Sequence, residues 1–215
     1  MNSFLKGHRH LLLGASAIFL LILLRMRWTH TLHFSFLGWN IFLAVLPLLF
    51  SHLAIKARSK WSAAAWAGLW LLFFPNAAYL LTDLVHLQMR HTSLFWLDLA
   101  ILFSAGVYGV LLGLISLRRM EALYTPLLRK GYVPLVSFAL LMLCGYGMYL
   151  GRVERWNSWD LFTQPFALLR DVLYDVRHPF RSREAWGMTA LFGSILSLFH
   201  LAGRRIGFRT PLSRH

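Results

Sequence analysis

Six long apolar runs follow one another along the chain, separated by shorter polar segments. They cover approximately residues 11–28, 34–55, 61–82, 95–117, 132–150 and 186–203. A helix needs about 20 mostly apolar residues to cross a bilayer. The pattern therefore predicts an all-α, polytopic integral membrane bundle with six transmembrane helices, and residues 1–215 are expected to form a single membrane domain.

The first apolar run is the shortest, and it could be read as a secretory signal because Lys6 and Arg9 precede it. However, it ends in Arg25 and Arg27, and no small-residue cleavage pattern follows. We therefore expect a retained helix whose two terminal arginines snorkel to the membrane interface.

A shorter periodic segment lies in the long connection between the fifth and sixth runs. From about 164 to 177, apolar and charged residues occupy opposite halves of a helical wheel. Such an amphipathic helix lies in the plane of the membrane interface. It could be a passive surface helix or a lid over the polar ends of its neighbours. The passive interpretation is favoured, because amphipathicity alone carries no chemistry.

Composition supports the membrane assignment. Hydrophobic residues make up 58% of the chain and charged residues 14%, and the mean hydropathy is +0.56. Soluble domains have about 45–50% apolar and about 25% charged residues. These values exclude an ordinary soluble globule, a disordered tail and a disulfide scaffold. The single cysteine, Cys144, lies in an apolar run and is expected to be a small buried residue.

The chain carries 22 basic and 8 acidic residues, giving a net charge of +14. In a soluble protein this excess would suggest a nucleic-acid partner. Here the basic residues lie between apolar runs and no nucleic-acid module accompanies them, so none is predicted. The loops on the side of the N-terminus hold Lys6, Arg9, Lys56, Arg58, Lys60, Arg118, Arg119, Arg129, Lys130, Arg204, Arg205, Arg209 and Arg214. The short loops on the opposite side hold only Arg25, Arg27 and Arg90. This asymmetry predicts that both termini are cytoplasmic.

The third run contains the most informative polar residues. On an α-helical wheel, four of them after Pro75 fall within an arc of about 80°. Ionisable groups at membrane depth face protein or water and suggest a functional site. The alternative is structural: the carboxylate pairs locally, and the amide satisfies a backbone carbonyl near the proline. This polar stripe consists of Asn76, Tyr79, Asp83 and His86, and Arg90 joins it if the helix continues.

Asp98 opens the fourth run, on the same wheel face as Ala105 and Gly109, so it is expected to point into the bundle. Together with Asp83 and His86 it could bind a metal through oxygen and imidazole ligands, or relay protons. No H-x-x-x-H pair, E-x-x-H pair or cysteine ligand accompanies the three residues. They are therefore weak metal candidates, and no cofactor is predicted.

Two G-x-x-x-G patterns occur in the apolar runs, at Gly109 with Gly113 and at Gly147 with Gly151. Small residues at this spacing let helices approach closely in lipid. We expect them to serve packing within the bundle rather than a dedicated dimer face.

The segment FPNAAYLLTDLVHL at residues 74–87 and the segment WNSWD at residues 156–160 resemble those of a family of small bacterial multi-pass membrane proteins known only as a domain of unknown function. The resemblance extends from the second run to the sixth. It implies a bacterial origin and the cytoplasmic membrane, and it supplies no catalytic residues because the family has no established activity. Trp156, Asn157 and Asp160 of the second segment join the polar stripe and Asp98 as candidate site residues.

Three functional hypotheses follow. The chain could be a non-catalytic membrane scaffold, with a membrane-protein partner or a second copy of itself. It could be a proton- or ion-coupled carrier that uses Asp83, His86 and Asp98. It could also be a membrane-embedded enzyme acting on a lipid or envelope substrate at the outer face of helices three to five. The lipid bilayer is the one partner common to all three, and no catalytic motif selects among them.

Overall fold

The computed structural model describes residues 9–32, 34–87 and 94–205. Lys6, Arg90, Arg209 and Arg214, which entered the sequence arguments, lie outside these ranges. Within them the chain is helical, with no strand. The helices are α2 (Arg9–Thr29), α3 (Ser35–Lys56), α4 (Lys60–Tyr79), η1 (Leu80–Leu87), α5 (Phe95–Tyr124), η2 (Thr125–Leu127), η3 (Lys130–Tyr132), α6 (Val133–Arg152), α7 (Asp160–Thr163), α8 (Pro165–Arg177) and α9 (Arg183–Arg205).

Six segments of the described chain are long and apolar enough to cross a membrane. They are Arg9–Thr29, Ser35–Lys56, Lys60–Leu87, Phe95–Leu127, Val133–Arg152 and Arg183–Arg205. The predicted all-α membrane fold is thus confirmed. The fourth segment is longer than its apolar run because α5 continues through charged residues, of which Arg119 and Glu121 are buried against neighbouring helices.

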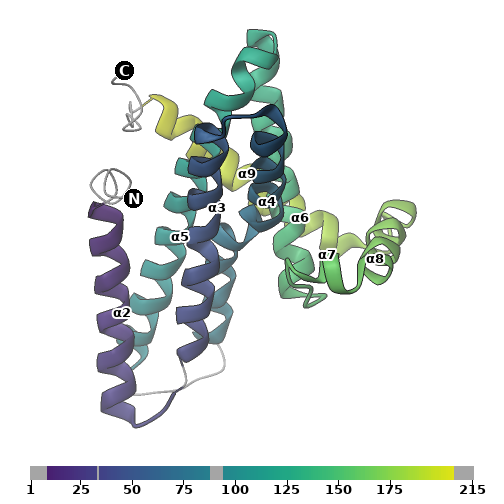
Figure 1. The fold of residues 1–215 in the computed structure, drawn as a ribbon. Helices are drawn as coiled ribbons and strands as arrows, with labels where there is room; N and C mark the ends of the chain where they lie inside the picture. The colour runs from purple at the N-terminus through teal and green to yellow at the C-terminus, as the bar shows by residue number, and fades with distance from the viewer. Residues whose placement is uncertain (1–8, 33, 88–93, 206–215) are drawn as a thin grey trace.

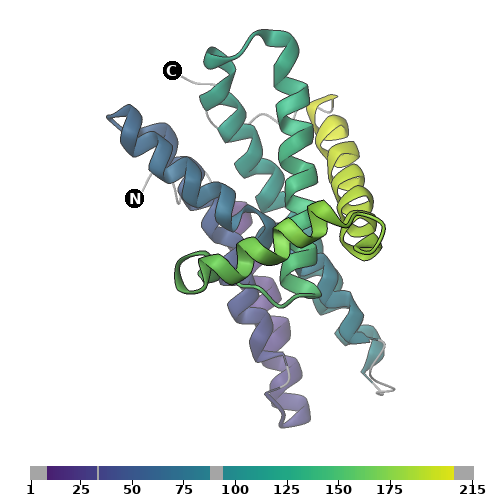
Figure 2. The ribbon, with the colours of Figure 1, turned by 90° about the vertical axis from the view of Figure 1, so that its right-hand side faces the viewer.

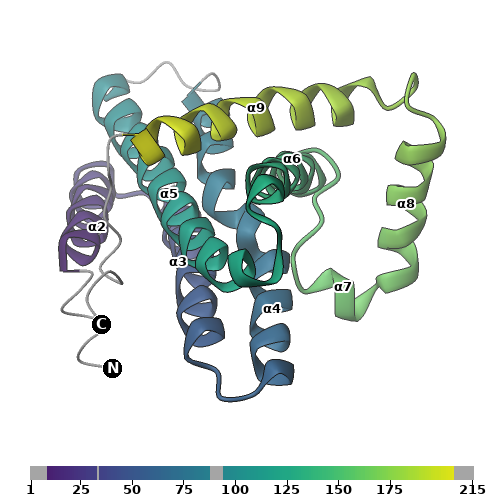
Figure 3. The same cartoon turned by 90° about the horizontal axis from the view of Figure 1, so that it is seen from above.

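The long helices form a bundle, with α2 at its margin and the helices α7 and α8 projecting from the opposite side (Figure 1). α3 packs along α4 and α5, and α9 packs along α6, whereas α2 lies at the edge against α5 and α3 (Figure 1). The short helix α7 and the helix α8 stand beside α6, at the far side from α2 (Figures 1 and 3). α8 runs across the direction of the long helices (Figure 2), as expected for a helix in the membrane plane.

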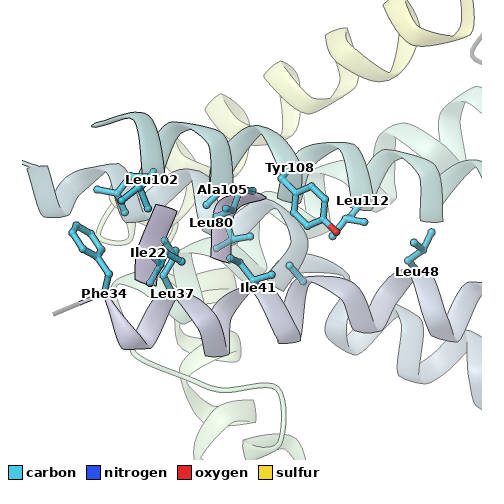
Figure 4. Close-up of a cluster of buried hydrophobic side chains, with 13 residues drawn as sticks. Ile22, Phe34, Leu37, Ile41, Leu48, Leu80, Leu102, Ala105, Tyr108 and Leu112 are labelled. Atoms are coloured by element: carbon cyan, nitrogen blue, oxygen red, sulfur yellow. The ribbon is translucent and has the colours of Figure 1, made fainter. Parts of the chain in front are cut away.

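One apolar core fills the space between α2, α3, η1 and α5. Ile41 and Leu37 of α3 meet Leu80 of η1 and Leu102 of α5 there (Figure 4). A second core lies between α4, α5 and α6 and includes the sulfur of Cys144, which is buried as predicted. Lipid offers no hydrophobic driving force between helices, so this contact is maintained by close packing.

The glycine pairs provide that close packing within the bundle, as predicted. Gly109 of α5 lies against the backbone oxygen of Ala77 in α4, and Gly147 of α6 lies against the ring of Pro75. An added Cβ at Gly151 would come within 3.1 Å of the Tyr79 ring. α4 is therefore clamped between α5 and α6 along the half that carries the polar stripe.

Candidate functional site

The polar stripe does not stay on one α-helix. The α-helix ends at Tyr79 and the chain continues as the 3₁₀-helix η1, which the sequence analysis did not predict. The hydroxyl of Thr82 donates to the carbonyl of Tyr79 over 2.6 Å at this junction. A 3₁₀-helix has about three residues per turn, so Asp83 and His86 lie one above the other. An α-helical wheel, which assumes about 100° per residue, therefore does not describe the positions of side chains after Tyr79.

Asp83 is the centre of a buried hydrogen-bond network. Its carboxylate is 1% exposed. Arg152, the last residue of α6, donates from Nη2 to Oδ1. Asn40 of α3 donates from Nδ2 to Oδ2 over 3.0 Å. One carboxylate thus joins α3, η1 and α6, and its buried charge is compensated by a fixed arginine.

Arg152 is held on several sides. Its Nε donates to the Thr82 hydroxyl over 2.8 Å, and its Nη1 lies 3.5 Å from Nε2 of His86. Its guanidinium carbon lies 4.4 Å from the centre of the Tyr79 ring, in cation–π geometry. His86 is more open, with a side chain 38% exposed and its ring against Phe36 at 5.0 Å. The guanidinium is therefore fixed by these partners and is not a free cation.

The segment WNSWD folds back onto the same part of α4. The Asn157 backbone N–H and side-chain amide both donate to Oδ2 of Asp160, which is buried and opens α7. The Ser158 hydroxyl accepts from Nδ2 of Asn76 over 2.8 Å and donates to the carbonyl of Leu72 over 3.1 Å. These bonds fasten residues 156–160 beside Pro75, which lies about 80 positions earlier in the chain.

A cavity of about 180 Å³ lies between these elements, and we call it the α3–α4–α6 pocket. It is lined by Trp39, Asn40, Leu43, Leu72, Pro75, Asn76, Tyr79, Gly147, Leu150, Gly151, Trp156, Asn157, Ser158, Trp159 and Leu168. Pockets for drug-sized ligands measure about 300–1,000 Å³, so this one suits a smaller group. Its walls combine amides, hydroxyls and tryptophan rings.

The helix α8 is attached to the bundle by two carboxylates and by Val172, which packs against the cluster of Tyr146, Tyr149 and Ala185. Asp175 accepts from the Tyr146 hydroxyl over 2.9 Å, and Asp171 accepts from Nε1 of Trp156 over 3.2 Å. Phe166 and Val176 remain 85% and 57% exposed. α8 thus turns two acids inward and an apolar face outward, and Leu168 forms one wall of the pocket.

Asp98 does not belong to this network. It is buried, as predicted, but Arg25 of α2 donates to both of its oxygens, over 2.9 and 3.2 Å. The expectation that Arg25 snorkels to the interface is wrong: the side chain is 2% exposed and points into the bundle. An acidic partner inside the protein removes the need to reach water. Arg27, the second arginine, is exposed.

The candidate residues therefore separate into groups. Four of them line the pocket: Asn76, Tyr79, Trp156 and Asn157. Asp83, His86 and Asp160 lie behind its walls through hydrogen bonds or close contacts, and Asp98 lies in its own ion pair. Among the described residues there is no group of three histidine, cysteine or acidic side chains that could hold a metal. Asp83 and His86 lie 4.0 Å apart, but Asp98 is held in its separate ion pair with Arg25.

Three residues that shape the site were not predicted from the sequence: Asn40, Arg152 and Ser158. Each pairs with a residue at least 43 positions away, and the relative rotation of two helices is not visible in a single sequence. The only signal was polarity, since Asn40 interrupts an apolar run and Arg152 ends one.

A second buried network at the opposite end of the bundle was also missed. His200 of α9 lies 2.9 Å from Oε1 of Glu121 in α5, and Ser137 of α6 donates to the same oxygen over 2.5 Å. The hydroxyl of Ser137 is bonded to the acid and not to the histidine, and it is buried. This order of contacts does not activate a serine nucleophile. The network fastens α9 to α5 and α6.

Comparison with known proteins gives a family match. The model of a family described as a protein of unknown function (DUF1361) matches residues 39–199. The match covers more than half of the chain, from Trp39 at the pocket to the last turns of α9, and it leaves α2 outside. No curated protein and no solved structure matches the chain.

Proposed function

We propose that this chain, which belongs to the DUF1361 family of proteins of unknown function, binds the headgroup of an amphiphilic membrane molecule in the α3–α4–α6 pocket. One observation carries the proposal. A cavity walled by amides and hydroxyls is placed among helices that are apolar enough to cross a membrane. Polar walls at that location suit a ligand that is itself half polar and half apolar.

The tryptophans support a position at the membrane surface. Trp39 and Trp159 line the pocket, are 54% and 37% exposed, and approach each other at 6.3 Å between ring centres. Exposed tryptophans gather at the level of lipid headgroups. A headgroup could therefore enter the pocket while its apolar chains stay in the bilayer.

The charges favour binding over ion transport or catalysis. Asp83 and Asp98 each form an ion pair with an arginine, so neither is available as a free proton carrier or general base. The same ion pairs favour the second candidate, a non-catalytic scaffold, because they serve to join helices. The pocket distinguishes the two: a pure scaffold has no use for a polar cavity.

We further propose that both termini are cytoplasmic and that the pocket lies at the extracytoplasmic face of a bacterial inner membrane. The excess of basic residues in the loops on the N-terminal side supports this orientation. α2 begins and α9 ends at the same end of the bundle (Figure 1), and the pocket lies toward the opposite ends of α3, α4 and α6.

Native mass spectrometry of the full chain, released from membranes in mild detergent, tests the binding function. Leu72→Phe adds a ring inside the pocket, whereas Leu71→Phe adds the same ring at a position 37% exposed on the same helix. We expect the wild type and Leu71→Phe to retain a bound amphiphile, and Leu72→Phe to lose it.

Leu43→Phe fills the pocket from α3 and serves as a second variant if Leu72→Phe does not fold. Folding is checked by a single symmetric peak in size-exclusion chromatography. An amphiphile held equally by the wild type and both pocket variants would contradict the proposed function, as would a bare wild-type protein.

A further inference from the structure

Each of three side-chain amides in the pocket wall donates at least one hydrogen bond from its nitrogen to a group of the protein. Asn40 donates to the Asp83 carboxylate, Asn76 to the carbonyl of Phe73 over 3.1 Å, and Asn157 to the Asp160 carboxylate over 3.2 Å. Carboxylates and carbonyls only accept hydrogen bonds. The orientation of each amide is thereby fixed, since a flipped amide would place two oxygens against each other.

The acceptor ends of these amides remain unused. Within the chain segments that the structure describes, no hydrogen bond reaches Oδ1 of Asn40, Asn76 or Asn157, and none reaches the Tyr79 hydroxyl. None of these atoms is sealed away from solvent either. The α3–α4–α6 pocket therefore offers three acceptors and one hydroxyl, and its ligand must supply hydrogen-bond donors.

Charge restricts the choice of donor. An anionic phosphate only accepts hydrogen bonds, so it would face the three amide oxygens with no donor between them, and the guanidinium of Arg152 is already bonded to Asp83 and Thr82. An ammonium group would enter beside a second cation, because the Arg152 guanidinium already lies over the ring of Tyr79 in the pocket wall. A neutral group rich in hydroxyls meets neither obstacle.

The tryptophan rings of the pocket favour a sugar among the neutral ligands that are rich in hydroxyls. A sugar ring carries hydroxyl donors around its edge and apolar C–H groups on its faces, and these faces pack on aromatic rings. Trp39 and Trp159 present such rings beside the three amide oxygens. We propose that the pocket binds a neutral glycosyl group, carried as the headgroup of a membrane glycolipid. This inference rests on the proposed amphiphile binding and specifies its ligand class.

The test uses the full chain in phosphatidylglycerol nanodiscs that contain a minor fraction of either monoglucosyl-diacylglycerol or phosphatidylethanolamine. Bound lipid is counted by native mass spectrometry. We expect the wild type to retain the glucosyl lipid and not phosphatidylethanolamine. Free methyl glucoside, added to phosphatidylglycerol nanodiscs, should bind weakly, because it lacks the apolar chains.

Tyr79→Phe keeps the ring under Arg152 and removes only the hydroxyl. We expect it to weaken glucosyl-lipid binding about five-fold, the factor for one net neutral hydrogen bond. Tyr108→Phe is the matched control, because its ring is packed in the core between α2, α3, η1 and α5 and does not line the pocket. Trp39→Leu should weaken binding further, whereas Trp96→Leu, at a more exposed position outside the pocket lining, should not.

The outcomes separate the two proposals. Phosphatidylethanolamine retained by the wild type and lost in Leu72→Phe would leave the binding function standing and overturn the glycosyl assignment. Free methyl glucoside binding as tightly as the lipid would overturn the lipid-borne source. Glucosyl lipid held equally by the wild type, Tyr79→Phe and Leu72→Phe would overturn the site itself.

Discussion

Arg25 and Asp98 form a bidentate ion pair inside the bundle, 73 positions apart in sequence. The pair joins α2 to α5, and the Arg25 guanidinium also lies 4.7 Å from the Phe34 ring centre. α2 otherwise packs against the bundle through apolar side chains such as Ile18 and Ile22, and it lies outside the family match. The ion pair is thus the main polar attachment of this marginal helix.

Asp98→Asn should therefore destabilise the protein, because it leaves the Arg25 charge buried without its partner. Breaking one side of a buried pair costs about 3–5 kcal/mol. The free energy of unfolding, measured by denaturant titration in detergent, reports the loss. The double variant Arg25→Met/Asp98→Asn should recover most of it, because both charges are gone.

Arg27→Met is the control for this experiment, since that arginine is exposed two residues away. It should leave the free energy of unfolding within experimental error. A double variant as unstable as Asp98→Asn alone would show that the ion pair does not account for the effect.

Gly147→Ala should destabilise the contact between α6 and α4. Its new Cβ would overlap the rigid ring of Pro75, and overpacking of this kind costs about 1–3 kcal/mol. In contrast, Gly68→Ala places a methyl group in open space on α4 and should be neutral or stabilising by up to about 1 kcal/mol. Thermal unfolding midpoints of the two variants, compared in one detergent, test this difference. Equal shifts in the two variants would contradict the close packing of α6 against α4 at Gly147.

The sequence predicted the helices well for a physical reason. A bilayer requires long apolar runs with internally satisfied backbones, so the six runs were sufficient to place the spans. The prediction was wrong where a charged residue finds its hydrogen-bond partners in the protein instead of in water. Arg25 was expected to reach the membrane interface, but in the structure it pairs with Asp98. α5 likewise continues past Arg118 because Glu121 finds partners on α6 and α9.

The candidate site was predicted in part for the same reason. Periodicity placed Asn76 and Tyr79 on one face, and both line the pocket. It could not predict that Thr82 would bond the Tyr79 carbonyl at the start of a 3₁₀-helix, nor that Arg152 would meet Asp83 from another helix. Local spacing encodes a helix face, whereas the partner of that face depends on tertiary packing.

His200→Leu should loosen α9 at the end of the bundle away from the pocket. Glu121 would keep Ser137 but lose the imidazole at 2.9 Å, and a hydrogen bond to a charged group contributes about 1.5–3 kcal/mol. Ser197→Ala on the same helix is the control, because that hydroxyl bonds only a carbonyl of its own helix, at Gly193. Hydrogen exchange of α9 amides should rise in the first variant and not in the second.

The proposed orientation can be tested with two matched cysteine variants. Trp159→Cys places a thiol beside the pocket, and Trp61→Cys places one at the opposite end of the bundle, where the native ring is 87% exposed. The native Cys144 is 1% exposed and should not react. With both termini cytoplasmic, an impermeant maleimide should label Trp159→Cys in intact cells and Trp61→Cys only after lysis. The reverse pattern would place the basic loops, and not the pocket, outside the cell, against the distribution of lysine and arginine.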